Sequence, residues 1–375
     1  FMTISYNDVI NYLTNLTPDS NLAKIRHERS VATENTQAVF EAIFSTPSTL
    51  LTNDVKYYFA HEVAKITGSP RLAEFYLQLI DSIPDEPLTQ PLSTAKEYLQ
   101  ILTQSPKDTH YQLIAALTEQ GWQESDIILL AQLITYVTYQ ARLIEGILLL
   151  TDNSSLTSNS SKVVAGKWNH QLLTRKGNSS PTSFTQDNLG WEAWISARDA
   201  KTLSVEEAQV MKKFGQLNSE YFLLLAHQSK ILELRTLVDR GVFYTSEGLP
   251  RWEREFAAAV TSKVNGCIYC ASVHARKASQ YAKERRADVD KLLATATGSV
   301  LAEGFDDRLL AITDLVASLS ATPIQATPSQ IEELQNLGLS ELELLDLVQS
   351  TAFFSWANRL MLSLGEPFEI VEDKE

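Results

Sequence analysis

Apolar residues recur along this chain with the spacing of an α-helix. The period is clearest at residues 111–117 and 127–134, and no stretch alternates apolar and polar positions over the length of a strand. Between residues 151 and 186 the pattern gives way to a polar, turn-forming segment rich in Ser, Thr and Asn. We therefore expect an all-α fold of two helical domains, residues 1–150 and 187–375, joined by residues 151–186 as a linker.

The polar segment has a second interpretation, as a long arm that wraps a partner subunit. Val163, Val164 and Trp168 would be the anchors of such an arm, since linkers usually lack apolar residues of this size. The sequence leaves both interpretations open.

The two predicted domains look like copies of one another, which indicates an internal duplication. Residues 121–143 can be laid on residues 338–360 without a gap, so that Arg142 falls on Arg359. Residues 55–72 can likewise be laid on 253–270, with Gly68 on Gly266. In this alignment the first copy has Ser69, Leu72 and Tyr76 where the second has Cys267, Cys270 and His274. Only the second copy is therefore expected to carry out thiol chemistry.

Composition narrows the class of protein. The chain has 375 residues, 44% of them hydrophobic, and a formal net charge of −14. A chain this acidic offers no basic stripe for phosphate contacts, so we expect no nucleic-acid partner. No apolar run reaches the roughly 18 residues of a membrane span, and the first residues lack the basic and apolar regions of a leader. Two cysteines do not make a disulfide framework, so we expect reduced thiols and a cytoplasmic location.

The most informative motif contains those two cysteines. Cys267, Cys270 and His274 are spaced so that they share one face if the segment is helical. The pair Asn265-Gly266 should end the preceding helix, so a new helix should open near Cys267. Thiols in the first turn of a helix feel its positive end, and we expect this to lower their pKa.

Glu255 lies before the same turn at nearly the same distance as His274 lies after it. If the two helices form an antiparallel hairpin, both residues stand roughly 15 Å from the turn, and they could meet directly or through a water. Glu255 would then orient His274, and His274 would take the proton from Cys270. Cys270 is the expected nucleophile because it is one turn from His274, whereas Cys267 is two turns away and better placed to resolve.

Plainer interpretations exist for each of these residues. A zinc site needs four ligands, and no second cysteine pair or His-x-x-x-His completes one, so we expect no metal. The cysteines could be buried and inert, and Glu255 could be a solvated charge in the run from Arg251. Arg359 is expected to be structural, bound to a buried acid such as Asp346 or Glu343 or to a helix C-terminus. Core or subunit-interface positions are expected for Trp252, Phe353, Phe354 and Trp356.

Residues 251–274 resemble the signature of the carboxymuconolactone decarboxylase and alkylhydroperoxidase D superfamily, a Glu twelve residues before Cys-x-x-Cys-x-x-x-His. Residues 352–360 are similar to the last core helix of that family, and the whole chain looks like its two-domain peroxidase-related fusions. The resemblance implies a thiol-dependent peroxidase that reduces organic hydroperoxides, with Cys270 as peroxidatic residue. It further implies a disulfide between Cys267 and Cys270, no bound cofactor, and a lipoyl-bearing protein or other external dithiol as reductant. Tyr269 is a departure, since the best-known peroxidases of the family have a second His between the cysteines.

Two other functions remain open. The same cysteines could serve a disulfide oxidoreductase or redox sensor that consumes no peroxide. A decarboxylase or isomerase of the same superfamily is the other alternative, although such members resemble one another without the cysteine pair.

Assembly and partners can also be anticipated. Single-copy members of the superfamily form trimers or hexamers, so a fused pair implies a homo-oligomer, a trimer first and a dimer as alternative. The basic residues that follow His274 could form a patch for an acidic partner, or an ordinary solvated helix face; they are Arg276, Lys277, Lys283, Arg285 and Arg286.

Overall fold

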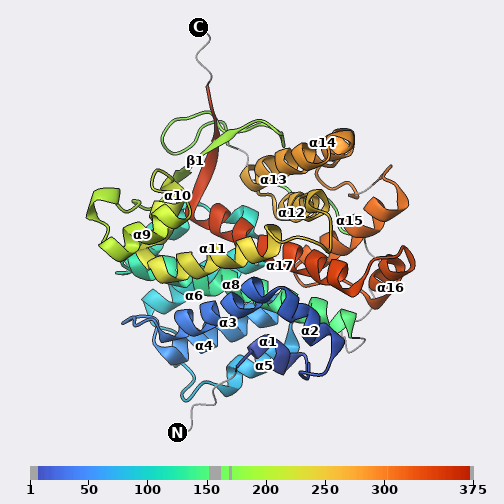
Figure 1. Ribbon diagram of the computed structural model, residues 1–375. Helices are drawn as coiled ribbons and strands as arrows, with labels where there is room; N and C mark the ends of the chain where they lie inside the picture. Colours follow the sequence, from blue (N-terminus) through green and yellow to red (C-terminus); the bar gives the residue numbers. More distant parts are fainter. Residues whose placement is uncertain (1–6, 152–161, 169–170, 302, 372–375) are drawn as a thin grey trace.

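Helices make up most of the chain that the structure describes. The computed structural model describes residues 7–151, 162–168, 171–301 and 303–371. Figure 1 shows helices throughout, with one small sheet close to the C-terminus. The all-α prediction is thereby confirmed, because this sheet only pairs the start of the second half with its end.

The first half contains, in order, α1 (Val9–Leu13), α2 (Asn21–Glu28), α3 (Ser30–Ser45), α4 (Asn53–Thr67), α5 (Pro70–Gln78), α6 (Gln90–Gln104), the short 3-10 helix η1 (Pro106–Asp108), α7 (Tyr111–Glu119) and α8 (Glu124–Leu150). The second half contains β1 (Leu189–Ala193), η2 (Ala200–Thr202), α9 (Val205–Lys213), α10 (Glu220–Leu225), η3 (Ala226–Gln228), α11 (Ser229–Phe243), α12 (Arg251–Asn265), α13 (Ile268–Tyr281), η4 (Lys283–Arg285), α14 (Arg286–Ala294), α15 (Asp307–Ser320), α16 (Pro328–Asn336), α17 (Glu341–Leu364) and β2 (Gly365–Glu369). Strands β1 and β2 are antiparallel, with Leu189 opposite Glu369 and Ala193 opposite Gly365.

Helices α8 and α17 form the centre of the fold and are buried along most of their lengths (Figure 1). They approach closely at Gly146, where a Cβ would lie only 2.4 Å from a methyl carbon of Val348. Contrary to the expectation from apolar runs, α8 is long and apolar enough to cross a membrane by length and composition. Its apolar window is entirely buried within the protein, however, so a core position accounts for that composition.

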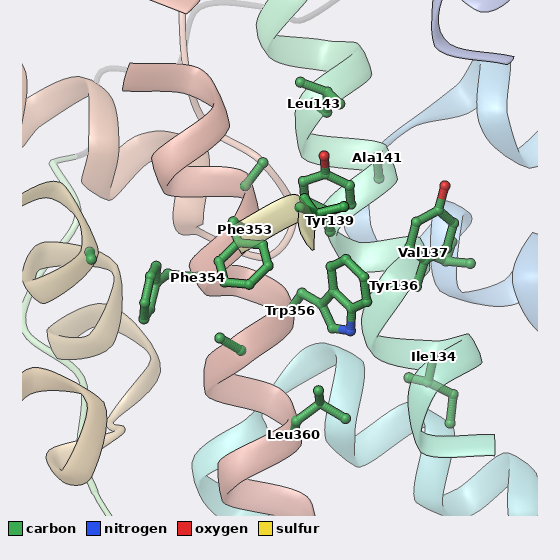
Figure 2. Close-up of a cluster of buried hydrophobic side chains, with 14 of the residues drawn as sticks. Ile134, Tyr136, Val137, Tyr139, Ala141, Leu143, Phe353, Phe354, Trp356 and Leu360 are labelled. Carbon is green, nitrogen blue, oxygen red and sulfur yellow. The ribbon is translucent and has the colours of Figure 1, made fainter. Parts of the chain in front are cut away.

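Aromatic side chains fill the contact between α8 and α17. Figure 2 shows Tyr136 and Tyr139 on α8 facing Trp356 on α17, and both ring centroids lie 5.3 Å from that of Trp356. The Trp356 indole N–H donates to Gln132 Oε1 at 3.0 Å, so its one polar group is satisfied inside the core. Trp356 is therefore a core residue, as expected. Phe354 lies on the side of α17 away from α8 (Figure 2).

Two buried arginines connect the halves of the molecule in a reciprocal way. Arg142 on α8 donates to the carbonyls of Leu319 and Ser320 at the C-terminal end of α15. Arg359 on α17 donates to the carbonyls of Leu102 and Thr103 at the C-terminal end of α6. Each cation therefore binds carbonyls at the negative end of a helix in the opposite half.

The expectation that Arg359 pairs with Asp346 or Glu343 is wrong, and its other expected partner, a helix C-terminus, is confirmed. Asp346 instead pairs with Arg29 at 2.8 Å and lies 3.4 Å from Arg254. No acid neutralises Arg359 among the described residues, and burial lowers its pKa to about 9.

We expect Arg359→Met to lower the free energy of unfolding by about 3 kcal/mol, because two buried carbonyls lose their charged donor. The urea midpoint should fall without a change in the slope of the unfolding transition. Arg240→Met, which changes an exposed arginine on α11, is the control and should alter stability by less than about 0.5 kcal/mol. Equal midpoints for the two variants would contradict the structural role of Arg359.

A second helix pair also joins the two halves. Helices α3 and α11 pack so closely that a Cβ on Gly241 would lie 2.3 Å from the backbone nitrogen of Ala32. One hydrophobic cluster includes buried residues from α1 through α17. The halves thus share a core, and their division at residues 1–150 and 187–375 stays a prediction, as does the duplication.

The described part of the polar segment lies against the second half of the same chain. Val164 forms a β-bridge with Val300, and the Gly166 N–H donates to the Lys263 carbonyl. Val163 and Trp168 pack on this chain's core. The proposed arm anchors therefore have contacts within one chain, and the most polar part, residues 152–161, lies outside the described residues.

Candidate active site

The predicted helical hairpin is confirmed and positions both cysteines. Helix α12 ends at Asn265, Gly266 adopts a left-handed conformation with φ 74°, and α13 begins at Ile268. Cys267 caps α13, and its N–H donates to the Ser262 carbonyl at 2.9 Å. The Asn265 side chain fixes the turn from the other side, because its amide donates to an amide oxygen on α17.

We expect Gly266→Ala to destabilise the protein by about 2–4 kcal/mol and to misplace Cys267. A side chain is strained at positive φ, and a Cβ at this position would lie 2.2 Å from the Lys167 carbonyl oxygen. Gly298→Ala is the matched control, since Gly298 has φ +82° but no atom within 4 Å of the added carbon. Equal melting temperatures for the two variants would show that the close contact at Lys167 has no effect.

Glu255 and His274 meet directly, as predicted. His274 Nδ1 lies 2.5 Å from Glu255 Oε2, while Arg251 donates to the other carboxylate oxygen through Nε at 2.9 Å. Glu255 is 0% exposed. Burial alone would raise its pKa, but the charge and hydrogen bond of His274, with Lys277 and Arg251, lower it below its usual value. Glu255 is therefore held as a carboxylate that orients the imidazole through Nδ1 and leaves Nε2 for chemistry.

A cavity of about 300 Å³ opens beside this pair and includes Cys270 in its wall. Its polar lining residues are Gln216, Ser219, Arg235, Asp239, Arg251, Glu255, Cys270, His274 and Lys277. Aromatic side chains also line it, namely Tyr221, Phe222, Phe243, Tyr244, Tyr269, Phe353 and Phe354. Cys267 is buried and is absent from the lining. Only one of the two thiols thus faces the cavity.

The two phenylalanines of α17 are core residues, as expected, and they also border the cavity. Phe353 and Phe354 both line the cavity, and the Phe354 ring meets the His274 ring edge-on with centroids 4.2 Å apart. The ring centroids of Phe243 and His274 are 6.1 Å apart. These rings exclude water from one side of the imidazole.

The structure also corrects the expected pKa of one thiol. Burial raises the pKa of Cys267 well above its usual value, and the hydrogen bond from its thiol to Cys270 and the charge of Cys270 raise it further. Backbone hydrogen bonds at the start of α13 act in the opposite direction but are weaker. The prediction that the helix N-terminus lowers the pKa is therefore wrong for Cys267, because desolvation outweighs the helix dipole. Cys267 remains a protonated thiol that donates to Cys270.

Tyr269, which takes the place of a second His, also lines the cavity. Burial is the main cause of a raised pKa of its phenol, and the charge of Cys270 raises this pKa further. Tyr269 therefore stays a neutral phenol next to Cys270.

The five basic residues after His274 do not all lie together, although Arg276, Lys283 and Arg286 line one pocket. Arg276 donates to the carbonyls of Gln186 and Asp187, and Arg285 pairs with Asp306 at 2.7 Å. Lys277 instead lines the cavity. Docking of an acidic partner at this helix face stays a prediction.

The first half contains a hairpin of the same form without thiols. Helix α4 ends at Thr67 and is capped by Gly68 with φ 90°, and α5 begins directly after Ser69. The Ser69 hydroxyl donates to Glu145, and the Tyr76 hydroxyl donates to Gln140. Ser69 and Tyr76, which the alignment matches with Cys267 and His274, thus have their hydrogen-bond partners inside the core.

Sequence reasoning missed most of the cavity lining, including Arg251, Arg235 and Tyr221. Arg251 was treated as part of a solvated run, although its spacing of four from Glu255 is the signal for a helical ion pair. Arg235 falls among the apolar positions of α11, at 231, 232, 234, 238 and 242, and a charge on a buried helix face is a recognisable signal. Tyr221 carries no signal in the sequence.

Among the residues that the structure describes, no group of three or more His, Cys, Asp or Glu side chains could hold a metal ion. The catalytic roles of the thiols, the imidazole and the carboxylate stay predictions.

Comparison with known proteins agrees with this geometry. Residues 230–312 match the sequence model described as the Carboxymuconolactone decarboxylase family, and the matched segment spans α11 to the start of α15. A search of curated proteins found no match to the chain. The match supports an enzyme of the decarboxylase-like or alkylhydroperoxidase D-like kind. This segment, which carries Glu255, both cysteines and His274, is therefore a region similar to the Carboxymuconolactone decarboxylase family.

Proposed function

We propose that the protein is a thiol-dependent peroxidase that reduces organic hydroperoxides at Cys270. The observation that carries this proposal is the direct contact between Glu255 and His274 in the wall of a cavity that also exposes Cys270. A carboxylate that fixes an imidazole beside a thiol is the arrangement that general-base activation of a nucleophile requires.

The proposed reaction has three steps, which are formation of a sulfenic acid, formation of a disulfide and reduction of that disulfide. His274 takes the proton of Cys270, and the thiolate attacks the terminal oxygen of the hydroperoxide. The O–O bond breaks, the alkoxide leaves as an alcohol with the proton from His274, and Cys270 becomes a sulfenic acid. The Cys267 thiol then attacks the Cys270 sulfur, so that a disulfide forms and water leaves. An external dithiol reduces this disulfide by exchange and is itself oxidised to a disulfide.

The different surroundings of the two thiols support this division of roles. Cys270 lines the cavity, where a hydroperoxide can reach it, whereas Cys267 lies behind it. Cys267 is held in its protonated form, which is a hydrogen-bond donor to Cys270 and a poor competitor for peroxide. Its position beside Cys270 suits the second step, when the Cys267 sulfur has to form the S–S bond.

Burial of Cys270 favours peroxide over a protein disulfide as oxidant. The Cys270 side chain is only 5% exposed and is reached through a cavity of about 300 Å³. A folded protein cannot bring a disulfide to that sulfur without rearrangement, whereas a small hydroperoxide can enter. A lipoyl group on a long arm fits the same entrance, so we include a lipoyl protein among the proposed reductants. The proposal also includes a homo-oligomer, trimer or dimer, in the cytoplasm.

Steady-state consumption of tert-butyl hydroperoxide with dihydrolipoamide as reductant tests the proposed function. We expect saturable consumption, with one disulfide formed in dihydrolipoamide per hydroperoxide reduced. If the protein exchanges thiols with lipoamide but consumes no hydroperoxide, it is a disulfide oxidoreductase and the peroxidase proposal fails.

A further inference from the structure

Arg235 on α11 is a buried cation without a protein partner. Its side chain is only 6% exposed, and its Nε has no hydrogen-bond acceptor among the described residues. Within the same residues no carboxylate lies at ion-pair distance from its guanidinium, although the structure contains many other arginine–carboxylate pairs. Burying a charge without a partner is costly, so an unpaired guanidinium inside a cavity indicates a site for an anion.

Two aromatic rings hold the guanidinium in place. The Arg235 guanidinium carbon lies 5.2 Å from the ring centroid of Phe353 and 5.7 Å from that of Tyr221. Such contacts with ring faces stabilise the cation while they leave the N–H groups at its edge free to donate. Arg235 is thus oriented by packing and does not depend on a protein acceptor.

The hydroxyl of Tyr221 is a second polar group without a partner in the same wall. Its oxygen is buried and has no hydrogen-bond partner among the described residues. Burial raises the pKa of Tyr221 to about 12, so the phenol keeps its proton and can donate it in a hydrogen bond. Two unsatisfied donors in one cavity point to a ligand with acceptor oxygens.

The remaining charges of the cavity also favour an anion. Arg251 and Glu255 neutralise one another at 2.8 Å. Asp239 is then the one acid in the lining that remains to balance the charges of Arg235 and Lys277. Burial raises the pKa of Asp239, although the charges of Arg235, His274 and Lys277 lower it. The wall therefore carries a net positive charge when His274 is neutral.

We infer that this cavity binds a substrate with a carboxylate head, which Arg235 and Tyr221 hold while its apolar body lies on the phenylalanines and its reactive group reaches Cys270. The inference rests on the proposed peroxidase function and specifies its substrate as an organic hydroperoxide that also bears a carboxylate. A planar guanidinium can bind a carboxylate through two parallel hydrogen bonds, which fixes orientation as well as affinity. The volume of about 300 Å³ is at the lower end for ligand cavities and so favours a compact acid.

Cumene hydroperoxide and its para-carboxylate derivative form a matched pair that tests the inference, since they differ only in the charged group. We expect wild type to show a kcat/KM about ten- to a hundredfold higher for the carboxylate, the range for hydrogen bonds to a charged group. Arg235→Met should remove this preference, so that the two hydroperoxides give similar kcat/KM values, and Arg235→Lys should retain part of it. Arg240→Gln changes an exposed arginine on the same helix and should behave as wild type.

Equal kcat/KM values for the two hydroperoxides in wild type would overturn the inference, and so would an unchanged preference in Arg235→Met. Circular dichroism shows whether Arg235→Met is folded; if it is not, the preference of Arg235→Lys relative to that of wild type decides the question.

Binding of para-isopropylbenzoate, measured by calorimetry, separates this inference from the proposed function because it needs no turnover. We expect binding to wild type that weakens at least about tenfold in Arg235→Met. Such binding without any peroxide consumption would contradict the peroxidase proposal and support the anion site. Peroxide consumption without carboxylate binding would contradict the anion site alone.

Discussion

Replacing Cys270 by Ser should abolish peroxide consumption, with a loss on the order of 10⁴-fold or more in kcat/KM. A serine hydroxyl at this position is not appreciably ionised at neutral pH, and no other thiol lines the cavity. The fold should be unaffected, since the substitution changes one atom. Coupled measurement of hydroperoxide loss gives the rate, and circular dichroism checks the fold.

Cys267→Ser is the matched control for this change. It should still reduce one equivalent of hydroperoxide per chain, because Cys270 can form its sulfenic acid, and then stop for lack of a resolving thiol. Activity unchanged in Cys270→Ser, or a single turnover that depends on Cys267 instead, would contradict the assignment of the nucleophile.

Glu255→Gln should lower kcat/KM about a hundredfold and shift the pH profile of the reaction upward. The carboxylate stabilises positive charge on His274, so an amide in its place makes proton transfer from Cys270 less favourable. A higher pH would then be needed to reach half of the maximal rate. The measurement is the rate of thiol oxidation by hydroperoxide as a function of pH.

Glu253→Gln provides a control on the same helix. Glu253 is also buried but binds Arg308 through both carboxylate oxygens at 2.9 Å, and it does not line the cavity. Its substitution should reduce stability and leave the pH profile unchanged. An identical pH profile for wild type and Glu255→Gln would argue against the relay.

Much of the site was predictable because local sequence determines the hairpin. Gly266 accepts a left-handed conformation, so helix α12 has to end there, and helical rise then places Glu255 and His274 at similar heights on antiparallel helices. Both steps depend on residues close together in the sequence. These two steps therefore do not depend on how the rest of the chain packs.

Properties that depend on distant residues were not predictable in this way. The raised pKa of Cys267 follows from its burial by the surrounding helices, which spacing along α13 cannot show. Phe353 and Phe354 lie in the core as expected, but the sequence did not show that the packing of α13 also makes them part of the cavity lining. Tyr221 and Arg235 come from two other helices, and only the tertiary fold brings them together.

The fold shows the same division between local and distant information. Helical periodicity predicted an all-α chain, and the residues matched without a gap, 121–143 and 338–360, lie mostly in the two central helices α8 and α17. The match could not show that Arg142 and Arg359 each bind a helix end in the opposite half. That contact requires knowledge of how the two halves pack.

Counting free thiols after a single addition of tert-butyl hydroperoxide to the reduced protein tests the central claim most directly. Our account predicts rapid loss of both thiols in wild type, with one disulfide formed between Cys267 and Cys270 per hydroperoxide reduced. Survival of both thiols under these conditions, in protein whose thiols still exchange with lipoamide, would contradict it.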